Sequence, residues 1–246
     1  FTALLPNQMA YYDLDAADLS YDSGIPIEGY EAIWGRAQLV FTYDEKYTAN
    51  PPKTYAELLD WAQENPGKFT FPKIPEDFVG SAFVRNAYYE LTSSEEALAI
   101  DMDEATFRAF SQPVIDYFKA LKPHLWNEGK TFPATQAQQD ALFKDGELAM
   151  TMGFEVGKTA GQIALGVYDP TVKTYVFESG TIGNAHYLAV PFNAPETAAA
   201  LLTIDFLQSP AAQLEKMKAD VWGDMPAFDP QRVDEAINDA LAEIGR

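Results

Sequence analysis

The stretch GYEAIWGRAQLVFTYD, residues 29–44, contains the first segment of the chain with a clear strand pattern. Its second half, Ala37–Tyr43, is a short run of mostly apolar, aromatic and β-branched residues, which predicts a buried strand. Before it, turn-forming residues recur so often over residues 1–31 that we expect a loop there. The first regular element is therefore expected at this strand.

Beyond that strand, helical and strand patterns alternate. Thr54 and Glu57 form a capping box, which predicts the start of a helix that ends at Asn65-Pro66-Gly67. Short strands alternating with helices are typical of an α/β fold with mainly parallel sheets. The further predicted strands are 68–72, 148–152, 174–179 and 186–191, and the further helices are 80–91, 103–123 (bent or split at Pro113), 135–146, 194–209 and 210–219.

The composition excludes several classes of function. The 246 residues include 37 acidic and 17 basic ones, a net charge of −20 that repels the phosphates of nucleic acids, so we expect no nucleic-acid partner. The absence of cysteine excludes disulfides, thiol catalysis and zinc-thiolate sites. No apolar run reaches the roughly eighteen residues of a membrane span. The chain begins at Phe1 without an initiator methionine or a signal peptide, as expected of a processed or trimmed product.

The stretch TMGFEVGKTAGQIA, residues 151–164, is superficially like a phosphate-binding loop. That motif needs four residues between its first glycine and the Gly-Lys-Ser/Thr, and only three separate Gly153 from Gly157. The residue at the required position is Met152, and Glu155 would place a negative charge where phosphate binds. We therefore interpret the stretch as a strand end and a helix start that face a ligand cleft, which makes Phe154 and Glu155 the candidate contacts.

Two enzymatic alternatives stay open. One is a phosphotransferase that uses residues 153–159 as a degenerate phosphate loop, and the other is a hydrolase built on a carboxylate pair. With 37 acidic residues some such pair always exists, so the second pattern does not discriminate. No HExxH or GxSxG motif and no histidine–carboxylate metal cluster is present, so we assign no catalytic residue, no metal ligand and no cofactor. A structural interaction module is a third alternative.

A few positions are candidates for a binding site on chemical grounds. Trp34, flanked by glycines, is expected on a loop just before the strand, where an indole ring either stacks on a ligand or closes the edge of the core. Trp222 has the same Trp-Gly setting. Gly80 and Ser81 are expected at a helix start, where free amides and a hydroxyl suit a polar ligand or form an ordinary cap. His186 is interpreted as a core or edge residue of a strand.

The order of several segments resembles a known family. GYEAIWGRAQLVFTYD leads into PPKTYAELLDWAQENPGKFTFP and DFVGSAF, and LFKDGELAMTM, GTIGNAHYLAVPFNAPE and AALLTIDFLQSPAAQ follow later. Over most of residues 24–229 this order is similar to that of the extracellular solute-binding proteins of bacterial ABC importers, of the two-lobed periplasmic type II. Within them it looks closest to the YnjB-like branch, and PPKTYAELL and FLQSPAAQ are its most specific segments.

The resemblance implies an α/β fold of the periplasmic-binding-protein type. Two lobes, each with a mainly parallel sheet, would be joined by crossover strands. Residues 1–43 and 180–246 would form part of lobe 1 with the hinge strands, and residues 44–179 would form lobe 2. Family members usually open with one or two βαβ units that this chain does not contain, so we expect an incomplete first lobe.

The resemblance also implies a function, which is to capture a small solute between the lobes and deliver it to a membrane permease. We expect a monomer that is periplasmic, or extracellular and membrane-associated, and is not an enzyme, with a small-molecule solute and ABC permease membrane subunits as its partners. The acidic surface and Trp34 favour a cationic, thiamine-like or polyamine-like solute. By position in the matched segments, the candidate ligand-binding residues are Trp34, Gly80, Ser81, Phe154, Glu155, Asn184 and Trp222.

Overall fold

The computed structural model describes residues 1–93 and 101–244, and the chain divides into two compact units. Unit 1 contains residues 1–38, 155–161 and 183–246, and unit 2 contains residues 39–154 and 162–182. From the sequence, residues 1–43 and 180–246 are expected in lobe 1. Both unit boundaries lie within five residues of that expectation, and the segment 155–161 joins unit 1 as well.

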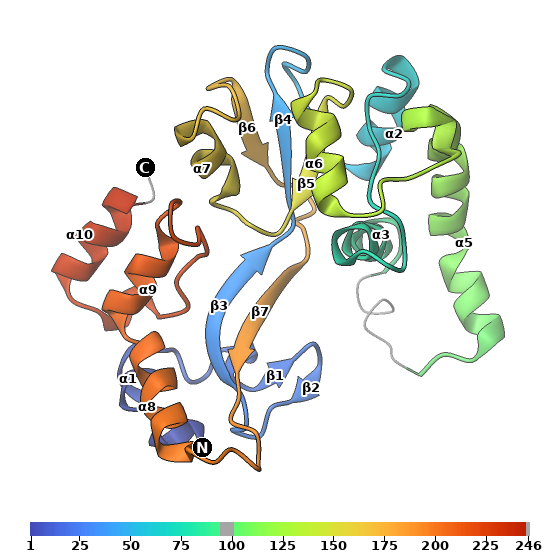
Figure 1. The fold of residues 1–246 in the computed structure, drawn as a ribbon. Coiled ribbons are helices and arrows are strands. Elements are labelled where there is room, and N and C mark those ends of the chain that lie inside the picture. The colour runs from blue at the N-terminus through green and yellow to red at the C-terminus, as the bar shows by residue number, and fades with distance from the viewer. Residues whose placement is uncertain (94–100, 245–246) are drawn as a thin grey trace. The chain divides into compact units, whose positions relative to one another are not determined.

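Unit 1 is organised around the antiparallel strands β3 (Ala32–Gln38) and β7 (Gly183–Leu188), which run through the centre of Figure 1. Their register shifts between Ile33 and Gly35, so Trp34 is the extra residue of a β-bulge. The other elements that lie wholly in unit 1 are η1 (Thr2–Leu4), α1 (Pro6–Tyr11), η2 (Ala17–Leu19), β1 (Tyr21–Asp22), β2 (Ile25–Pro26), α8 (Thr197–Leu207), α9 (Pro210–Met217), η5 (Pro230–Arg232) and α10 (Glu235–Ile244).

Two apolar clusters hold unit 1 together. Successive residues of a strand point to opposite faces, and accordingly Ile33 joins one cluster while its neighbour Ala32 joins the other. The buried members of the first are Tyr12, Ile33, Leu214, Ala227 and Phe228, and those of the second are Leu5, Ala32 and Ile204.

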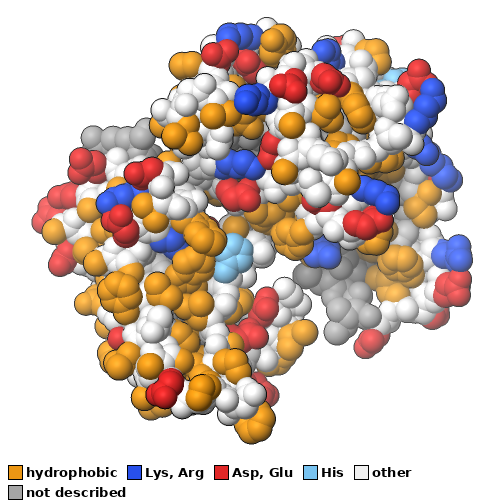
Figure 2. All heavy atoms as spheres, in the orientation of Figure 1, with side chains coloured by type: hydrophobic (Ala, Val, Ile, Leu, Met, Phe, Trp, Pro, Cys, Tyr) orange, Lys and Arg blue, Asp and Glu red, His pale blue; other side chains and the backbone are white. Residues whose placement is uncertain are grey.

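Helix α8 is apolar around most of its surface, and only part of that surface is buried. Ile204 is 6% exposed, whereas Leu202 and Phe206 are 74% and 64% exposed. Figure 2 shows hydrophobic side chains (orange) gathered in the region of this helix, at the lower left. A surface of this kind is suited to contact with another polypeptide segment.

Unit 2 contains a three-stranded sheet with β4 (Val40–Asp44) at its centre. β5 (Met150–Gly153) and β6 (Val172–Tyr175) pair with it on either side, both antiparallel (Figure 1). The helices around this sheet are α2 (Tyr55–Glu64), α3 (Phe78–Leu91), α5 (Glu104–Leu121), η3 (Lys122–His124), η4 (Trp126–Gly129) and α6 (Gln136–Lys144), while α7 (Lys158–Ala164) spans the boundary with unit 1.

Local sequence signals account for several helix ends. The Thr54 hydroxyl accepts a hydrogen bond from the Glu57 amide, which confirms Thr54 as the cap of α2. The Glu57 carboxylate accepts a hydrogen bond from the Lys53 amide, one residue before the cap, so the reciprocal half of the predicted capping box is shifted by one position. Helix α9 starts with Pro210 at its first position, as predicted. The sequence predicts a helix that Pro113 bends or splits; helix α5 continues through Pro113 as one element, so it is not split there, and the bend stays a prediction.

The structure corrects the expected strand arrangement. All pairings recorded among the described strands are antiparallel, not mainly parallel, because strand–helix alternation identifies elements but not their pairing direction. The predicted strand 37–43 is two strands that meet at Leu39. Residues 68–72 are in no strand, although Lys68 and Phe69 accept backbone hydrogen bonds from Ala149 and Trp126. The region 1–31 contains short helices and a hairpin, and α10 was not predicted.

Candidate functional site

The β-bulge at Trp34 brings two of the predicted site residues together. The indole rings of Trp34 and Trp222 are 5.2 Å apart and nearly perpendicular, the edge-to-face geometry that aromatic pairs prefer. Trp222 is 57% exposed, so most of its ring is free to contact another molecule. Trp34 lies on β3 and not on the predicted loop, because pairing with β7 extends the strand toward the N-terminus.

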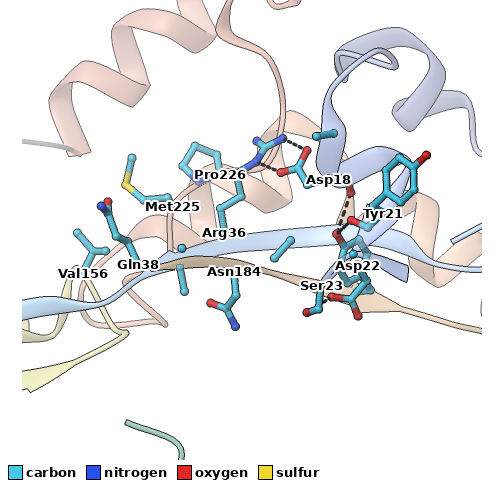
Figure 3. Close-up of a pocket in the computed structure, with 16 residues that line it drawn as sticks. Asp18, Tyr21, Asp22, Ser23, Arg36, Gln38, Val156, Asn184, Met225 and Pro226 are labelled. Carbon is cyan, nitrogen blue, oxygen red and sulfur yellow. Dashed lines mark hydrogen bonds and ion pairs between the residues drawn. The ribbon is translucent and has the colours of Figure 1, made fainter. Parts of the chain in front are cut away.

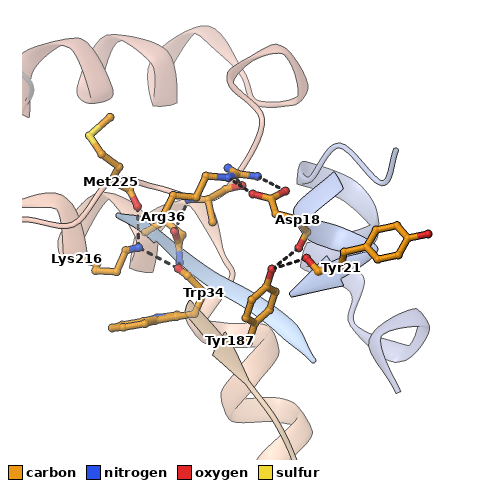
Figure 4. A network of polar contacts seen from close by, with 9 residues as sticks. Asp18, Tyr21, Trp34, Arg36, Tyr187, Lys216 and Met225 are labelled. Atoms are coloured by element: carbon orange, nitrogen blue, oxygen red, sulfur yellow. Dashed lines mark hydrogen bonds and ion pairs between the residues drawn. The ribbon is translucent and has the colours of Figure 1, made fainter. Parts of the chain in front are cut away.

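A buried ion pair lies beside the two tryptophans. The Lys216 ammonium is 3.1 Å from the Asp224 carboxylate and 5.0 Å from the centre of the Trp34 ring, and burial lowers the pKa of Lys216. Figure 4 shows this ammonium donating to the carbonyl oxygens of Trp34 and Met225. His186 Nδ1 is 3.8 Å from the same Asp224 carboxylate, and this imidazole is 39% exposed.

A hollow of about 750 Å³ runs along the same strand pair (Figure 3). Its charged centre is Arg36 of β3, whose guanidinium binds both oxygens of Asp18 at 2.6 and 3.2 Å and donates to the Ala227 carbonyl. This bidentate pair compensates the positive charge of Arg36. The residues that line the hollow are Ala17, Asp18, Tyr21, Asp22, Ser23, Gly24, Arg36, Ala37, Gln38, Val156, Gly183, Asn184, Ala185, Tyr187, Met225 and Pro226.

The hairpin β1–β2 contributes a second carboxylate to the hollow. Ser23 and Gly24 both have positive φ, which the tight turn between these two-residue strands requires. The turn places Asp22 in the lining, where its carboxylate accepts a hydrogen bond from the Ser23 hydroxyl. Among the described residues, no cationic side chain forms a salt bridge with Asp22, so the hollow carries one uncompensated negative charge.

The Tyr187 side chain of β7 forms hydrogen bonds with the hairpin region, which here means residues 18–26. Its hydroxyl lies 2.8 Å from the Asp18 carbonyl and 3.2 Å from the Tyr21 carbonyl, so its proton can be donated to either (Figure 4). Burial, together with the negative charges of Asp18 and Asp22, raises the pKa of Tyr187 to about 12. The phenol therefore remains a neutral hydrogen-bond donor at physiological pH.

Asn184, a predicted site residue, lies on β7 opposite Ala37 and lines the hollow. Its Oδ1 atom is buried, and no described residue donates a hydrogen bond to it. In Figure 3 the Asn184 side chain points away from the side of the strand pair that carries Arg36. Among the predicted site residues that the structure describes, Asn184 is thus the one whose buried side-chain oxygen accepts no hydrogen bond.

The predicted residues of unit 2 have packing explanations. Helix α3 is capped by Asp77, so Gly80 and Ser81 lie inside its first turns and not at its start as predicted. Gly80 is buried, and a Cβ there would lie 2.1 Å from the Pro72 carbonyl oxygen, which only glycine avoids. Phe154 is buried, with its ring 5.0 Å from that of Phe78 at the first position of the same helix.

The stretch that is superficially like a phosphate loop also has a packing explanation. The Gly157 amide donates to the Gly223 carbonyl, and a Cβ on Gly157 would lie 2.6 Å from that oxygen. Lys158 begins helix α7 and lies 4.0 Å from Glu155, which is half-exposed. The glycine therefore allows two backbone segments of unit 1 to meet, and the phosphotransferase alternative is not favoured.

Several residues of the hollow were not predicted from the sequence. Asp18 and Arg36 are an anion and a cation that are 18 positions apart, and their pairing appears only in the fold. The Ser23-Gly24 dipeptide is a turn signal that could have identified the hairpin and hence Asp22. The polar and large side chains of the hollow and the ion pair that were not predicted include Asp18, Tyr21, Asp22, Arg36, Gln38, Tyr187, Lys216, Asp224 and Met225.

The fold places the chain in the class of type II periplasmic-binding-protein-like structures. A crystal structure of an ABC transporter from Clostridium perfringens has a TM-score of 0.64 at 18% identity, covering 98% of this chain and 66% of its own. The spermidine/putrescine ABC transporter substrate-binding protein PotD from Streptococcus pneumoniae has a TM-score of 0.63 at 14% identity, covering 95% and 65%. A periplasmic thiamin binding protein has a TM-score of 0.55 at 13% identity, covering 90% and 61%.

The chain belongs to the bacterial extracellular solute-binding protein family, whose sequence profile matches residues 3–239. It is 39% identical over 220 residues to Protein YnjB of Escherichia coli K12. That match covers 89% of this chain and 56% of the relative, so the chain spans about half the length of this curated relative. Proteins of this family bind solutes and are not enzymes.

No helix described in residues 1–93 and 101–244 has the length and apolar character needed to cross a membrane. Within the same residues, no three His, Cys, Asp or Glu side chains gather in a way that could hold a metal ion.

Proposed function

We propose that the chain is part of the substrate-binding component of an ABC importer, which captures a small solute in the periplasm and delivers it to membrane permease subunits. Membership of the extracellular solute-binding family supports this function. The likeness to substrate-binding proteins of ABC transporters supports it as well, since the matching fold extends over nearly all of this chain.

The observation that carries the choice of solute is the hollow of unit 1. Its cation, Arg36, is already paired with Asp18, whereas Asp22 has no cationic partner among the described residues. The exposed ring of Tyr21 is also among the residues that line the hollow. A free carboxylate and an aromatic face suit a small cationic solute. Two of the similar structures are a spermidine/putrescine substrate-binding protein and a thiamin binding protein, and we extend that class, cationic amines and thiamine-like rings, to this chain.

The predicted ligand-binding residues remain part of this proposal. In unit 1, Trp34 and Trp222 would supply an aromatic surface, Asn184 a hydrogen-bond acceptor and Glu155 a further carboxylate. In unit 2, Ser81 and Phe154 would supply a hydroxyl and a ring, and Gly80 would allow the close packing of α3. We further propose that the protein acts as a monomer and has no nucleic-acid partner.

Thermal-shift and calorimetric titrations with spermidine, putrescine and thiamine test the proposal, because a ligand that binds the folded state raises its melting temperature. We expect at least one of these cations to stabilise the protein, and we expect Asp22→Asn to weaken that binding about tenfold. Asp15→Asn is the matched control, since Asp15 is exposed on the same unit and does not line the hollow.

Two results would count against the proposal. The first is stabilisation by none of the three cations, and the second is equal weakening by Asp22→Asn and Asp15→Asn. Mg-ATP serves as the negative arm of the same titration. Stabilisation by Mg-ATP that is lost in Lys158→Ala would revive the phosphotransferase alternative.

A further inference from the structure

The Lys216 ammonium has no donor left for a solute. Its three hydrogen bonds go to the carbonyl oxygens of Trp34 at 2.9 Å and Met225 at 2.8 Å and to the Asp224 carboxylate at 3.1 Å. The Lys216 side chain is 4% exposed and that of Asp224 is 6% exposed. A lysine in this position cannot attract a ligand from solution, so its role concerns the protein segments that it joins.

Those segments are the β-bulge of β3 and the turn that carries Trp222. The Trp34 carbonyl belongs to the bulge, and the Asp224 side chain and the Met225 carbonyl lie two and three residues after Trp222. The Gly223 amide donates to the Lys216 carbonyl, which closes the turn onto the end of α9. One side chain thus binds the residues on either side of the contact between the two indole rings.

The backbone at Gly35 packs closely against the Lys216–Asp224 pair. A Cβ on Gly35 would lie 2.1 Å from the Asp224 Oδ2 atom and 2.8 Å from the Lys216 Nζ atom. On the other side of the turn, Gly157 and Gly223 meet backbone to backbone. The bulge, the ion pair and the turn therefore fit together in one arrangement, and any displacement of the pair would move Trp222.

Stability alone does not explain a buried ion pair. Removing two charges from water is costly, and well-packed apolar residues of similar volume often stabilise a protein at least as well. The lowered pKa of Lys216 reflects this cost of burial. The ion pair differs from apolar residues because its hydrogen bonds are directional. Each of them fixes the position of one backbone or side-chain atom.

We propose that Lys216 and Asp224 are positioning residues, which hold the exposed ring of Trp222 edge-on to Trp34 and so set the shape of the aromatic surface that meets the solute. This inference rests on the proposed function insofar as it assigns that surface to a solute. The arrangement of the rings is a property of the protein by itself, and it can be measured without a solute.

The test compares Lys216→Met with the double variant Lys216→Met/Asp224→Leu. The single variant leaves a buried carboxylate unpaired, and we expect it to lower the melting temperature. The double variant removes both charges, and we expect its melting temperature to return close to the starting value. If the pair positions Trp222, both variants lose the near-ultraviolet circular dichroism of the coupled indoles, which Trp222→Phe identifies. Both also bind spermidine or thiamine at least tenfold more weakly.

Lys218→Met and Asp220→Asn are the matched controls, because both side chains are exposed near the same turn. Far-ultraviolet circular dichroism establishes that each variant folds. A double variant that regains both the melting temperature and the indole signal would overturn the inference, because the pair would then be merely structural. If the unchanged protein binds none of the probes, the proposed function fails, whereas the indole signal still decides the positioning role.

Discussion

The interiors of the two units are stabilised by different kinds of interaction. In unit 2 the buried ring of Phe83 contacts a group of other aromatic rings at centroid distances of 5.1–6.2 Å, namely those of Phe41, Tyr55, Phe69, Phe71 and Phe118. In unit 1 buried amides and an ammonium bind backbone carbonyls, as Gln208 does at Ile33 and Gln213 and Lys216 do at Trp34.

The difference shows what each kind of interior is suited to do. Aromatic packing stabilises through the apolar area that it buries, and small shifts between rings change its energy little. Hydrogen bonds to single carbonyl oxygens fix the position of the backbone that carries them. Unit 1, whose bulge and turn carry the candidate site, is thus built on the interactions with the stricter geometry.

The largest effect is expected from Phe83→Ala in unit 2. Loss of the central ring leaves a cavity among the surrounding aromatic residues, and such truncations lower the free energy of unfolding by about 3–5 kcal/mol. Urea denaturation measures the loss. Phe107→Ala is the control, because Phe107 is 50% exposed on α5. A loss below about 1 kcal/mol would show that the aromatic cluster is not the core of unit 2.

A smaller effect is expected from Gln213→Met in unit 1. Its carboxamide donates to the Trp34 and Leu207 carbonyls and accepts from the Ala227 amide, and all three partners would lose a buried hydrogen bond. We expect the free energy of unfolding to fall by about 2–3 kcal/mol. Hydrogen exchange should also show faster exchange at the Ala227 amide. Unchanged protection there would mean that hydrogen bonding does not hold this part of unit 1.

The smallest effect is expected from Tyr187→Phe, which removes the hydroxyl that joins β7 to the hairpin region. Loss of one hydrogen bond lowers the free energy of unfolding by about 1 kcal/mol. Tyr21→Phe is the control, since Tyr21 is 52% exposed.

The pH dependence of the same residue sharpens this test. The pKa of Tyr187 is about 12 in the folded protein and about 10 in an unfolded chain, so folding favours the protonated phenol. Its contribution to stability is fully present below pH 10 and is lost as the pH rises toward 12. Tyr187→Phe should remove this part of the alkaline decline. An identical decline in the variant would contradict the assignment.

The sequence predicted those parts of the fold that depend on neighbouring residues. The helix cap at Thr54, the proline start of α9 and the helix after Gly157 all involve contacts within a few positions, and all were confirmed. The direction of the strand pairs was not predicted, because β3 and β7 meet only after some 140 residues of intervening chain.

The candidate site illustrates the same limit. Trp34 and Trp222 could be singled out by their Trp-Gly settings, but their contact could not be inferred. Lys216 lies in an ordinary helical pattern, where a lysine is expected at the surface. Its burial follows from the Trp34 carbonyl 182 positions earlier, which no local pattern reports. Gly80 was predicted as a binding residue, but the structure explains it by packing against Pro72. A glycine needed for packing and a glycine needed for binding look the same in a sequence.

The order of segments along the chain has a consequence for biosynthesis. All of unit 2 lies between residues 39 and 182, whereas β3 is synthesised long before its partners in β7 and α9. On the ribosome, unit 2 is therefore complete while β3 is still an unpaired edge, and domains generally fold as units as they emerge. A folded unit 2 brings residues 38 and 183 together in advance, which lowers the entropy lost when the late segments close onto the early ones.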